Sequence, residues 1–188
     1  MKKVTFLIAA VLFTVFSVTG QETQVDVNSS KITWLGKKVT GEHTGHIKFK
    51  SANLLLDGKK LKGGMFEVDM STITCTDIEN EEYNAKLVGH LKSDDFFGIE
   101  KHPVSQLKLT KVKSIDTGYK VEGDLTIKGN THPINFDVKQ DGNVFVGKVT
   151  VDRTKYNVRY GSGKFFDNLG DKMIYDDFEL TFKVTLLK

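Results

Sequence analysis

Five histidines and a single cysteine are among the side chains of this sequence that could bind a transition metal or act as a base or nucleophile. His43 and His46 are near one another, with two residues between them. The helical zinc-protease motif instead places two histidines four positions apart, beside a glutamate. A zinc site further requires three or four converging ligands, which no spacing in this sequence indicates. We therefore expect neither a metal site nor a cofactor.

Cys75 is the only cysteine, so the chain cannot form an internal disulfide and must be stabilised by packing. It could be a free nucleophile or an intermolecular bridge, but a buried apolar role is favoured because free cysteine is among the most buried residue types. No nucleophile–base pair or carboxylate dyad emerges from the spacing. We therefore expect a protein that is not an enzyme, and a base at His43 or His132 is the weakest hypothesis.

Arg153 follows Val149 and Val151 at alternate positions, which predicts that its guanidinium points toward the interior or its mouth. A buried arginine needs an anionic partner, and Asp152, Asp124 or a ligand head group could provide one. A structural ion pair is the favoured alternative, and a head-group contact remains open. His43 and His46 are further head-group candidates, although on a strand at most one of them faces inward.

The elements that must position these residues are mostly strands. From Phe178 to Leu186, apolar residues alternate with polar ones, which is typical of antiparallel sheet with one face in water. Turn signals such as Asp57-Gly58, Lys128-Gly129-Asn130 and Asp141-Gly142-Asn143 separate such runs. Short strands at regular spacing indicate a sandwich or barrel. The strand segments are 32–39, 46–56, 61–70, 105–113, 119–127, 134–138, 144–151 and 178–187.

One segment, 77–91, has helical spacing instead. Asp77 could cap its N-terminus, and acidic residues follow where they suit the helix dipole. Its apolar residues recur on one face: Tyr83, Leu87, Val88 and Leu91. The sequence thus predicts an all-β protein, an antiparallel barrel of about eight strands, with one helix outside the sheet or across one barrel end.

The first twenty residues have the pattern of a secretory signal peptide: Lys2 and Lys3, an apolar core over 4–18, and a small-residue site before Gln21. The apolar core is shorter than a membrane span of ~20 residues. We expect a signal peptide over 1–20, a single domain over 21–188, no stable membrane span, and a periplasmic or secreted location. The formal net charge of +3 includes Lys2 and Lys3, so the mature chain gives no electrostatic indication of nucleic-acid binding.

The barrel interior is predicted to be rich in aromatic side chains, since the chain has 13 phenylalanines. An eight-stranded barrel has room for packed side chains or one small ligand. The pattern of residues is equally compatible with a filled core and with a ligand cavity. The interior candidates are Trp34, Phe49, Phe66, Leu125, Ile127, Phe136, Phe145, Val149, Phe178 and Phe182.

Four motifs, in order, resemble those of the YceI-like lipid/polyisoprenoid-binding family. They lie over 39–47, over 91–97 with His102-Pro103 after it, over 123–133 and over 151–156. The resemblance covers about 24–188. The sequence departs from the family pattern at Asn157, where many members have glycine, and in the loop 160–170.

The resemblance implies a lipocalin-like barrel that binds an isoprenoid or fatty-acid-like lipid in its interior. The resulting hypothesis is an exported carrier of such a lipid. The alternative is a non-catalytic structural or interaction protein with a filled core that acts through its surface. A homodimer is left open.

Overall fold

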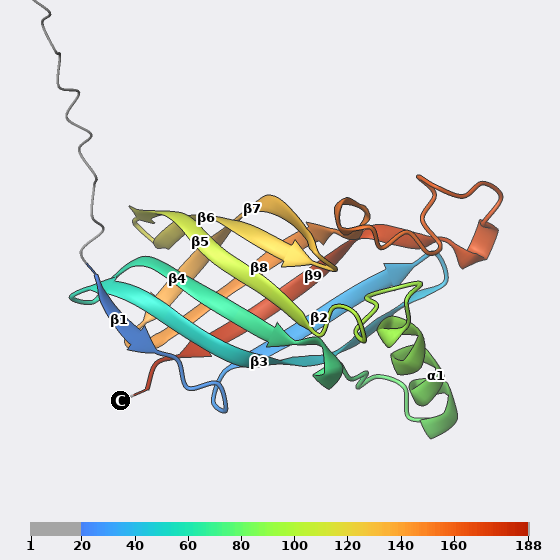
Figure 1. Ribbon diagram of the computed structural model, residues 1–188, viewed down its shortest axis with the longest axis horizontal. Helices are drawn as coiled ribbons and strands as arrows, with labels where there is room; N and C mark the ends of the chain where they lie inside the picture. The colour runs from blue at the N-terminus through green and yellow to red at the C-terminus, as the bar shows by residue number, and fades with distance from the viewer. Residues whose placement is uncertain (1–19, 188) are drawn as a thin grey trace, which may run out of the picture.

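The computed structural model describes residues 20–187. Eight long strands form a closed antiparallel barrel, because the strand order β2-β9-β8-β7-β6-β5-β4 is completed by the pairing of β4 with β3 and of β3 with β2 (Figure 1). The prediction of an eight-stranded antiparallel barrel with one helix is confirmed. The strands are β1 (Gln21–Gln24), β2 (Lys31–Lys38), β3 (Gly41–Asp57), β4 (Lys60–Asp69), β5 (Val104–Ile115), β6 (Gly118–Ile127), β7 (Asn130–Asp141), β8 (Val144–Asp152) and β9 (Ile174–Thr185).

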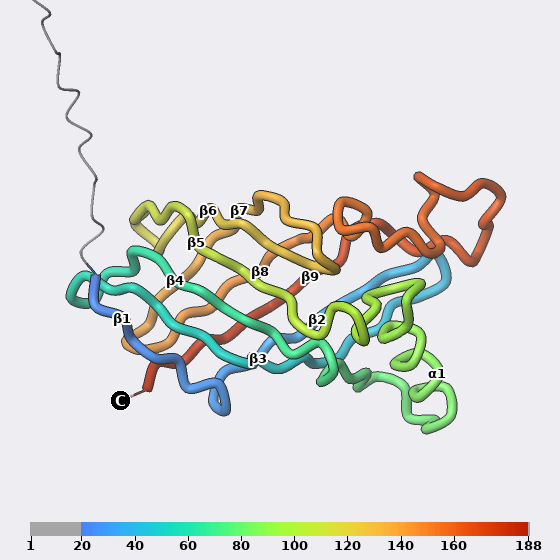
Figure 2. Tube along the Cα trace, viewed as in Figure 1, coloured from blue at the N-terminus to red at the C-terminus, as the bar shows by residue number. Residues whose placement is uncertain are grey.

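Strand β3 is long enough to serve three neighbours. Its first half pairs with β2, through registers such as Ile32 with Ile47, and its second half pairs with β4. The short strand β1 pairs with the second half of β3, on the side that β2 has left. Val25, directly after β1, forms a bridge with Leu186, directly after β9, so β1 and the end of β9 lie at the same end of the barrel (Figure 2). The predicted signal peptide falls almost wholly on residues 1–19, outside the described residues.

The three turns that the sequence indicated join β3 to β4, β6 to β7 and β7 to β8. Gly58 joins β3 to β4 and Gly142 joins β7 to β8, with φ of 58° and 57°. Left-handed backbone of this kind costs glycine nothing, whereas most side chains resist it. These two turns and the β5–β6 connection lie at one end of the barrel, which we call the hairpin end (Figure 1).

The helix α1 (Glu81–Lys92) lies at the opposite end, which we call the helix end (Figure 1). The expected N-cap was wrong. The N-cap is Asn80, whose side-chain oxygen accepts from the backbone N–H of Tyr83, and not Asp77. Tyr83 is 63% exposed, so only Leu87, Val88 and Leu91 pack on the barrel. Within residues 20–187, no helix has the length and apolar composition that a membrane crossing requires.

Three single turns of 3-10 helix complete the fold: η1 (Met70–Thr72), η2 (Arg153–Tyr156) and η3 (Gly170–Lys172). Asn157 ends η2 in the left-handed region, with φ of 59°. Asparagine is the residue besides glycine that most readily adopts this conformation. The sequence departure at Asn157 therefore preserves the backbone shape that a glycine there would take.

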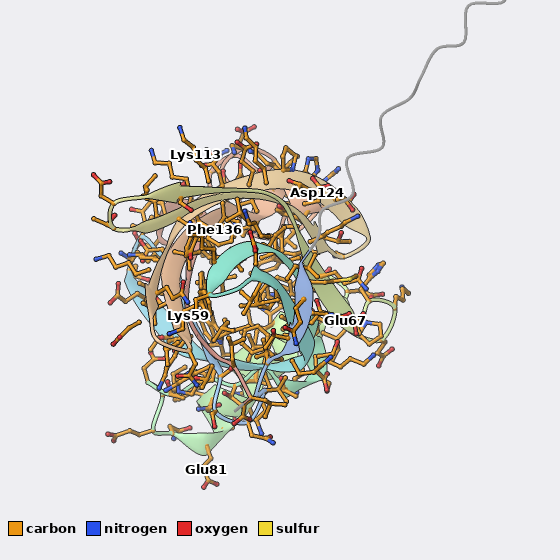
Figure 3. The ribbon with its side chains drawn as sticks, turned by 90° about the vertical axis from the view of Figure 1, so that its left-hand side faces the viewer. Lys59, Glu67, Glu81, Lys113, Asp124 and Phe136 are labelled. Carbon is orange, nitrogen blue, oxygen red and sulfur yellow. The ribbon has the colours of Figure 1, made fainter. Side chains whose placement is uncertain are left out.

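Seen along the barrel from the hairpin end, the strands form a ring (Figure 3). Phe136 lies inside the ring, whereas Lys113, Asp124 and Glu81 lie on the outside (Figure 3). For the strand residues Phe136, Lys113 and Asp124, this arrangement follows from the period of two, which sends alternate side chains to opposite faces, whereas Glu81 is on α1. The interior of the barrel is thus the place to look for a ligand site.

Candidate ligand-binding cavity

Two cavities lie inside the barrel, with volumes of about 140 and 100 Å³. The larger one is at the helix end, where Leu91 of α1 and the following Phe96 and Phe97 form part of its wall. Five apolar side chains line both cavities, so the two are neighbouring compartments of one bore. The shared side chains are Ile32, Val68, Leu107, Leu125 and Leu180.

The smaller compartment is lined only by apolar side chains. Several of them face inward and yet are only partly buried, among them Phe66, Phe136 and Phe182. Phe136 and Phe182 meet edge to face, with ring centroids 5.6 Å apart. An inward-facing aromatic ring in a filled core would be fully covered. The partial exposure agrees with the two cavities, which show that side chains do not fill the interior.

The hairpin end of the bore is closed by a short chain of neutral hydrogen bonds. The Tyr119 hydroxyl donates to Gln140 Oε1 at 2.7 Å and accepts from the backbone N–H of Leu61 at 3.3 Å. Gln140 Nε2 in turn donates to the carbonyls of Lys59 and Gly142. These bonds tie β4, β6, β7 and two hairpin turns together across the end of the barrel.

At the helix end, the aromatic pair Phe96-Phe97 covers the larger compartment. Both rings are less than a tenth exposed, and Phe97 packs edge to face against Phe178 of the wall. Lys128, in the β6–β7 turn, donates to the carbonyls of Asp94 and Phe96 at 2.6 and 2.8 Å. Burial lowers the pKa of Lys128. We call residues 94–97, held in this way, the aromatic cap.

Arg153 lies in the wall of the larger compartment and is 2% exposed. Its guanidinium donates to four backbone carbonyls, those of Val158, Tyr160, Ile174 and Tyr175, at 2.9–3.0 Å. Burial lowers its pKa, which the nearby carboxylate of Asp176, 3.8 Å away, partly offsets. These carbonyl bonds leave the group little capacity for a ligand head group. Its geometry is that of a brace between η2, the loop after it and β9.

All ten predicted interior residues line the bore. Trp34, Ile127 and Phe178 line the larger compartment, and Leu125 lines both. The smaller compartment is lined by Phe49, Phe66, Phe136, Phe145, Val149 and Phe182. Contact of these residues with a ligand stays a prediction.

The two histidine head-group candidates line neither compartment. His43 Nδ1 is 2.8 Å from Oδ2 of Asp77, and His46 Nδ1 is 3.3 Å from the Thr33 hydroxyl. Cys75 is buried, as expected, but its thiol donates to Asp77 at 3.2 Å. Sequence reasoning missed the aromatic cap, its lysine and this role of Asp77. Of these three features, only the cap could have been found from the sequence, because it is part of the motif at 91–97.

Residues 23–186 match the family model described as YceI-like domain. A UPF0312 protein of Staphylococcus epidermidis is 30% identical over 140 residues, which are 61% of this chain and 77% of that protein. The crystal structure of Burkholderia cenocepacia BcnA has a TM-score of 0.66 at 23% identity and covers 87% of this chain and 99% of its own. A polyisoprenoid binding domain from Saccharophagus degradans, implicated in plant cell wall breakdown, has a TM-score of 0.57 at 12% identity and covers 89% and 98%.

Proposed function

The chain belongs to the YceI-like domain family, and we propose that it is a carrier that encloses a polyisoprenoid or similarly long apolar chain in its barrel. The observation that carries this proposal is the bore itself, two apolar compartments that share five wall residues. The name of the Saccharophagus degradans domain supports the same ligand class. Binding, and not catalysis, is proposed because the walls offer apolar surface and no nucleophile–base pair.

The size of the compartments indicates how a chain would lie. An apolar cavity of about 150 Å³ takes up a molecule the size of benzene. Each compartment therefore holds only part of a polyisoprenoid, and a long chain must run through both. Leu180 is one of the five side chains that line both compartments, so it borders the proposed passage between them. Burial of apolar surface, at ~0.8 kcal/mol per methylene, would supply the affinity without a specific polar contact.

The helix end is the proposed entrance. The hairpin end is closed by paired strands and the Tyr119–Gln140 hydrogen bonds, so opening it would break the barrel. The aromatic cap, in contrast, is a non-strand segment. It is held by main-chain hydrogen bonds from Phe96 and Phe97 to the carbonyls of Ser93 and Leu91 at the end of α1, and by the two Lys128 hydrogen bonds. Moving the cap exposes the larger compartment and leaves the strand pairing intact.

A block between the compartments tests the proposal. In Leu180→Phe, we expect affinity for a long polyprenol to fall at least about tenfold, while affinity for prenol, the alcohol of a single isoprene unit, is kept. Leu35→Phe is the matched control, because Leu35 is on the neighbouring strand but lines only the outer surface. Binding is measured by displacement of an apolar fluorophore, and circular dichroism verifies the fold. Unchanged long-chain binding in Leu180→Phe, or no binding by the native protein, would refute a continuous bore.

Export through the signal peptide at 1–20 completes the proposed role, because a lipid carrier serves membranes that an aqueous compartment separates. The chain expressed with its first twenty residues should be recovered from the periplasm or medium with Gln21 as its first residue. Intact-mass measurement checks this. A protein that keeps Lys2 and Lys3 and stays in the cytoplasm would contradict it.

A further inference from the structure

Three side chains that carry different metal-ligand atoms converge outside the bore, at the helix end. His43 comes from β3, while Cys75 and Asp77 come from the segment between η1 and α1. The His43 nitrogen, the Cys75 sulfur and an Asp77 carboxylate oxygen all lie within 4.8 Å of one another. His43 Nδ1 is 2.8 Å from Asp77 Oδ2, and the Cys75 Sγ is 3.2 Å from Oδ1.

The backbone fixes the segment that carries Cys75 and Asp77. Thr74 and Thr76 donate their N–H groups to the carbonyls of His46 and Thr44, both at 2.9 Å, so the segment runs along the start of β3. From α1, the side-chain Nδ2 of Asn84 donates to the carbonyls of Cys75 and Ile78. The three side chains are thus held together by main-chain pairing, before any ligand is considered.

Gly45 makes this close approach possible. A Cβ atom at this position would lie 1.8 Å from the carbonyl oxygen of Thr74. Any other residue at position 45 would therefore push the segment away from β3. The glycine lies between the two residues of β3 whose carbonyls accept from the segment.

The order of the three groups is wrong for a cysteine nucleophile. Such a nucleophile needs a histidine between the thiol and the carboxylate, to take the thiol proton. Here the carboxylate of Asp77 lies next to the thiol. Burial and this contact with Asp77 raise the pKa of Cys75, which opposes thiolate formation in the absence of a cation. A cation between the three groups would reverse that balance.

We propose that His43, Cys75 and Asp77 bind a divalent transition-metal ion of the zinc type. Nitrogen, sulfur and carboxylate oxygen are the ligand atoms that Zn²⁺ takes in proteins, and tetrahedral coordination places ligand atoms roughly 3.3–3.6 Å apart. The separations of 2.8 and 3.2 Å join His43 and Cys75 to different oxygens of Asp77, and the ligand atoms of all three side chains lie within 4.8 Å of one another. Small side-chain rotations would bring them to tetrahedral spacing. On binding, the thiol proton leaves to solvent and the metal–sulfur bond forms in its place.

Solvent reaches the cluster from one side. The side chains of His43 and Asp77 are 34% and 31% exposed, whereas Cys75 is buried. The ion can therefore enter from solvent, and the fourth coordination position is open to water or another small ligand. Three protein ligands with an open fourth position distinguish this arrangement from a closed structural zinc site.

Cobalt titration of the chelator-treated protein tests the site. Co²⁺ should bind at one equivalent with visible absorption typical of tetrahedral geometry and a thiolate-to-cobalt charge-transfer band, and Zn²⁺ should displace it. Cys75→Ser should abolish the charge-transfer band, and His43→Gln and Asp77→Asn should each weaken Zn²⁺ binding at least about tenfold. His46→Gln is the matched control, since His46 is on the same strand but outside the cluster, and should bind Zn²⁺ like the native protein.

Absence of the charge-transfer band in the native protein, or equal weakening in His46→Gln, would overturn the proposal. If Cys75→Ser does not fold, His43→Gln decides the question, because this side chain is partly exposed and on a strand whose pairing does not depend on it. Lipid binding is measured in separate experiments without metal. The metal proposal and the proposed carrier function can therefore fail independently.

Discussion

The two ends of the bore are built by different means. At the hairpin end, strands and tight turns surround a compartment lined only by apolar side chains, and the closing hydrogen bonds join neutral groups. At the helix end, the larger compartment is completed by a helix, a cap and a loop, and charged side chains hold these segments by their backbone carbonyls. The comparison teaches that regular sheet closes one end, whereas the irregular segments at the other end also depend on Arg153 and Lys128, which donate to their carbonyls.

The largest effect should follow from removing Arg153. Arg153→Met removes the arginine donor from four carbonyls, in one buried and three part-buried hydrogen bonds, so we expect the free energy of unfolding to fall by about 3–5 kcal/mol. Arg159→Met is the matched control, because Arg159 is exposed and lies over the ring of Phe165. Urea unfolding measures both. A loss below about 1 kcal/mol in Arg153→Met would contradict its role as a brace.

The close approach at Gly45 should give the next effect. Gly45→Ala places a methyl group against the Thr74 carbonyl, and overpacking of this kind costs about 1–3 kcal/mol. Gly89→Ala in α1 has no atom within 4 Å of the new methyl group and should stabilise the protein by up to about 1 kcal/mol. Thermal unfolding compares the two variants. Equal stability of both would mean that the 73–77 segment is free to move away from β3.

A pair of variants compares the two closures directly. Lys128→Met and Tyr119→Phe each remove two hydrogen bonds, and each should cost about 1–2 kcal/mol of stability. Only Lys128→Met loosens the proposed entrance, so it alone should raise the dissociation rate of a bound polyprenol several-fold. Stopped-flow fluorescence follows the release. Faster release from Tyr119→Phe would place the entrance at the hairpin end.

The smallest expected effect is a pH dependence at Asp152. Burial raises the pKa of this carboxyl, but the hydrogen bonds from Thr154 and Lys164 outweigh burial and hold it below its ordinary value. The stabilisation is therefore present above about pH 4 and is lost as the pH falls through the lowered pKa. Asp152→Asn should lower stability by at most about 1 kcal/mol at neutral pH, with no difference in strong acid. A difference that does not change with pH would contradict this assignment.

The barrel was predictable from the sequence because every second residue of a strand faces the interior, and these residues are apolar. This is why all ten interior candidates line the bore, from Trp34 in β2 to Phe182 in β9. The same alternation does not tell whether the inward rings contact one another. It therefore could not decide between a filled core and two compartments. Side-chain volumes across the barrel decide that, and they depend on register and curvature.

The helix end was less predictable, because its contacts join residues far apart in sequence. His43 and Asp77 are 34 positions apart, and Lys128 is 32 positions from Phe96. Asp77 was expected to cap the helix, since it is the first acid before the helical pattern, yet Asn80 is nearer to the first turn and takes that role. Arg153 was placed correctly as buried. Its hydrogen-bond partners are carbonyls, which no side-chain pattern reveals, and the carboxylate within ion-pair distance is that of Asp176, where the sequence suggested Asp152 or Asp124.

The most direct test of the central claim is the dependence of affinity on chain length in the native protein. Prenyl alcohols of increasing length are bound to the purified mature chain, and each dissociation constant is measured. The bore predicts that affinity rises at least about tenfold with each added isoprene unit until both compartments are filled, and then levels off. Affinity that does not depend on chain length, or no measurable binding at any length, would contradict a carrier that holds its ligand inside the barrel.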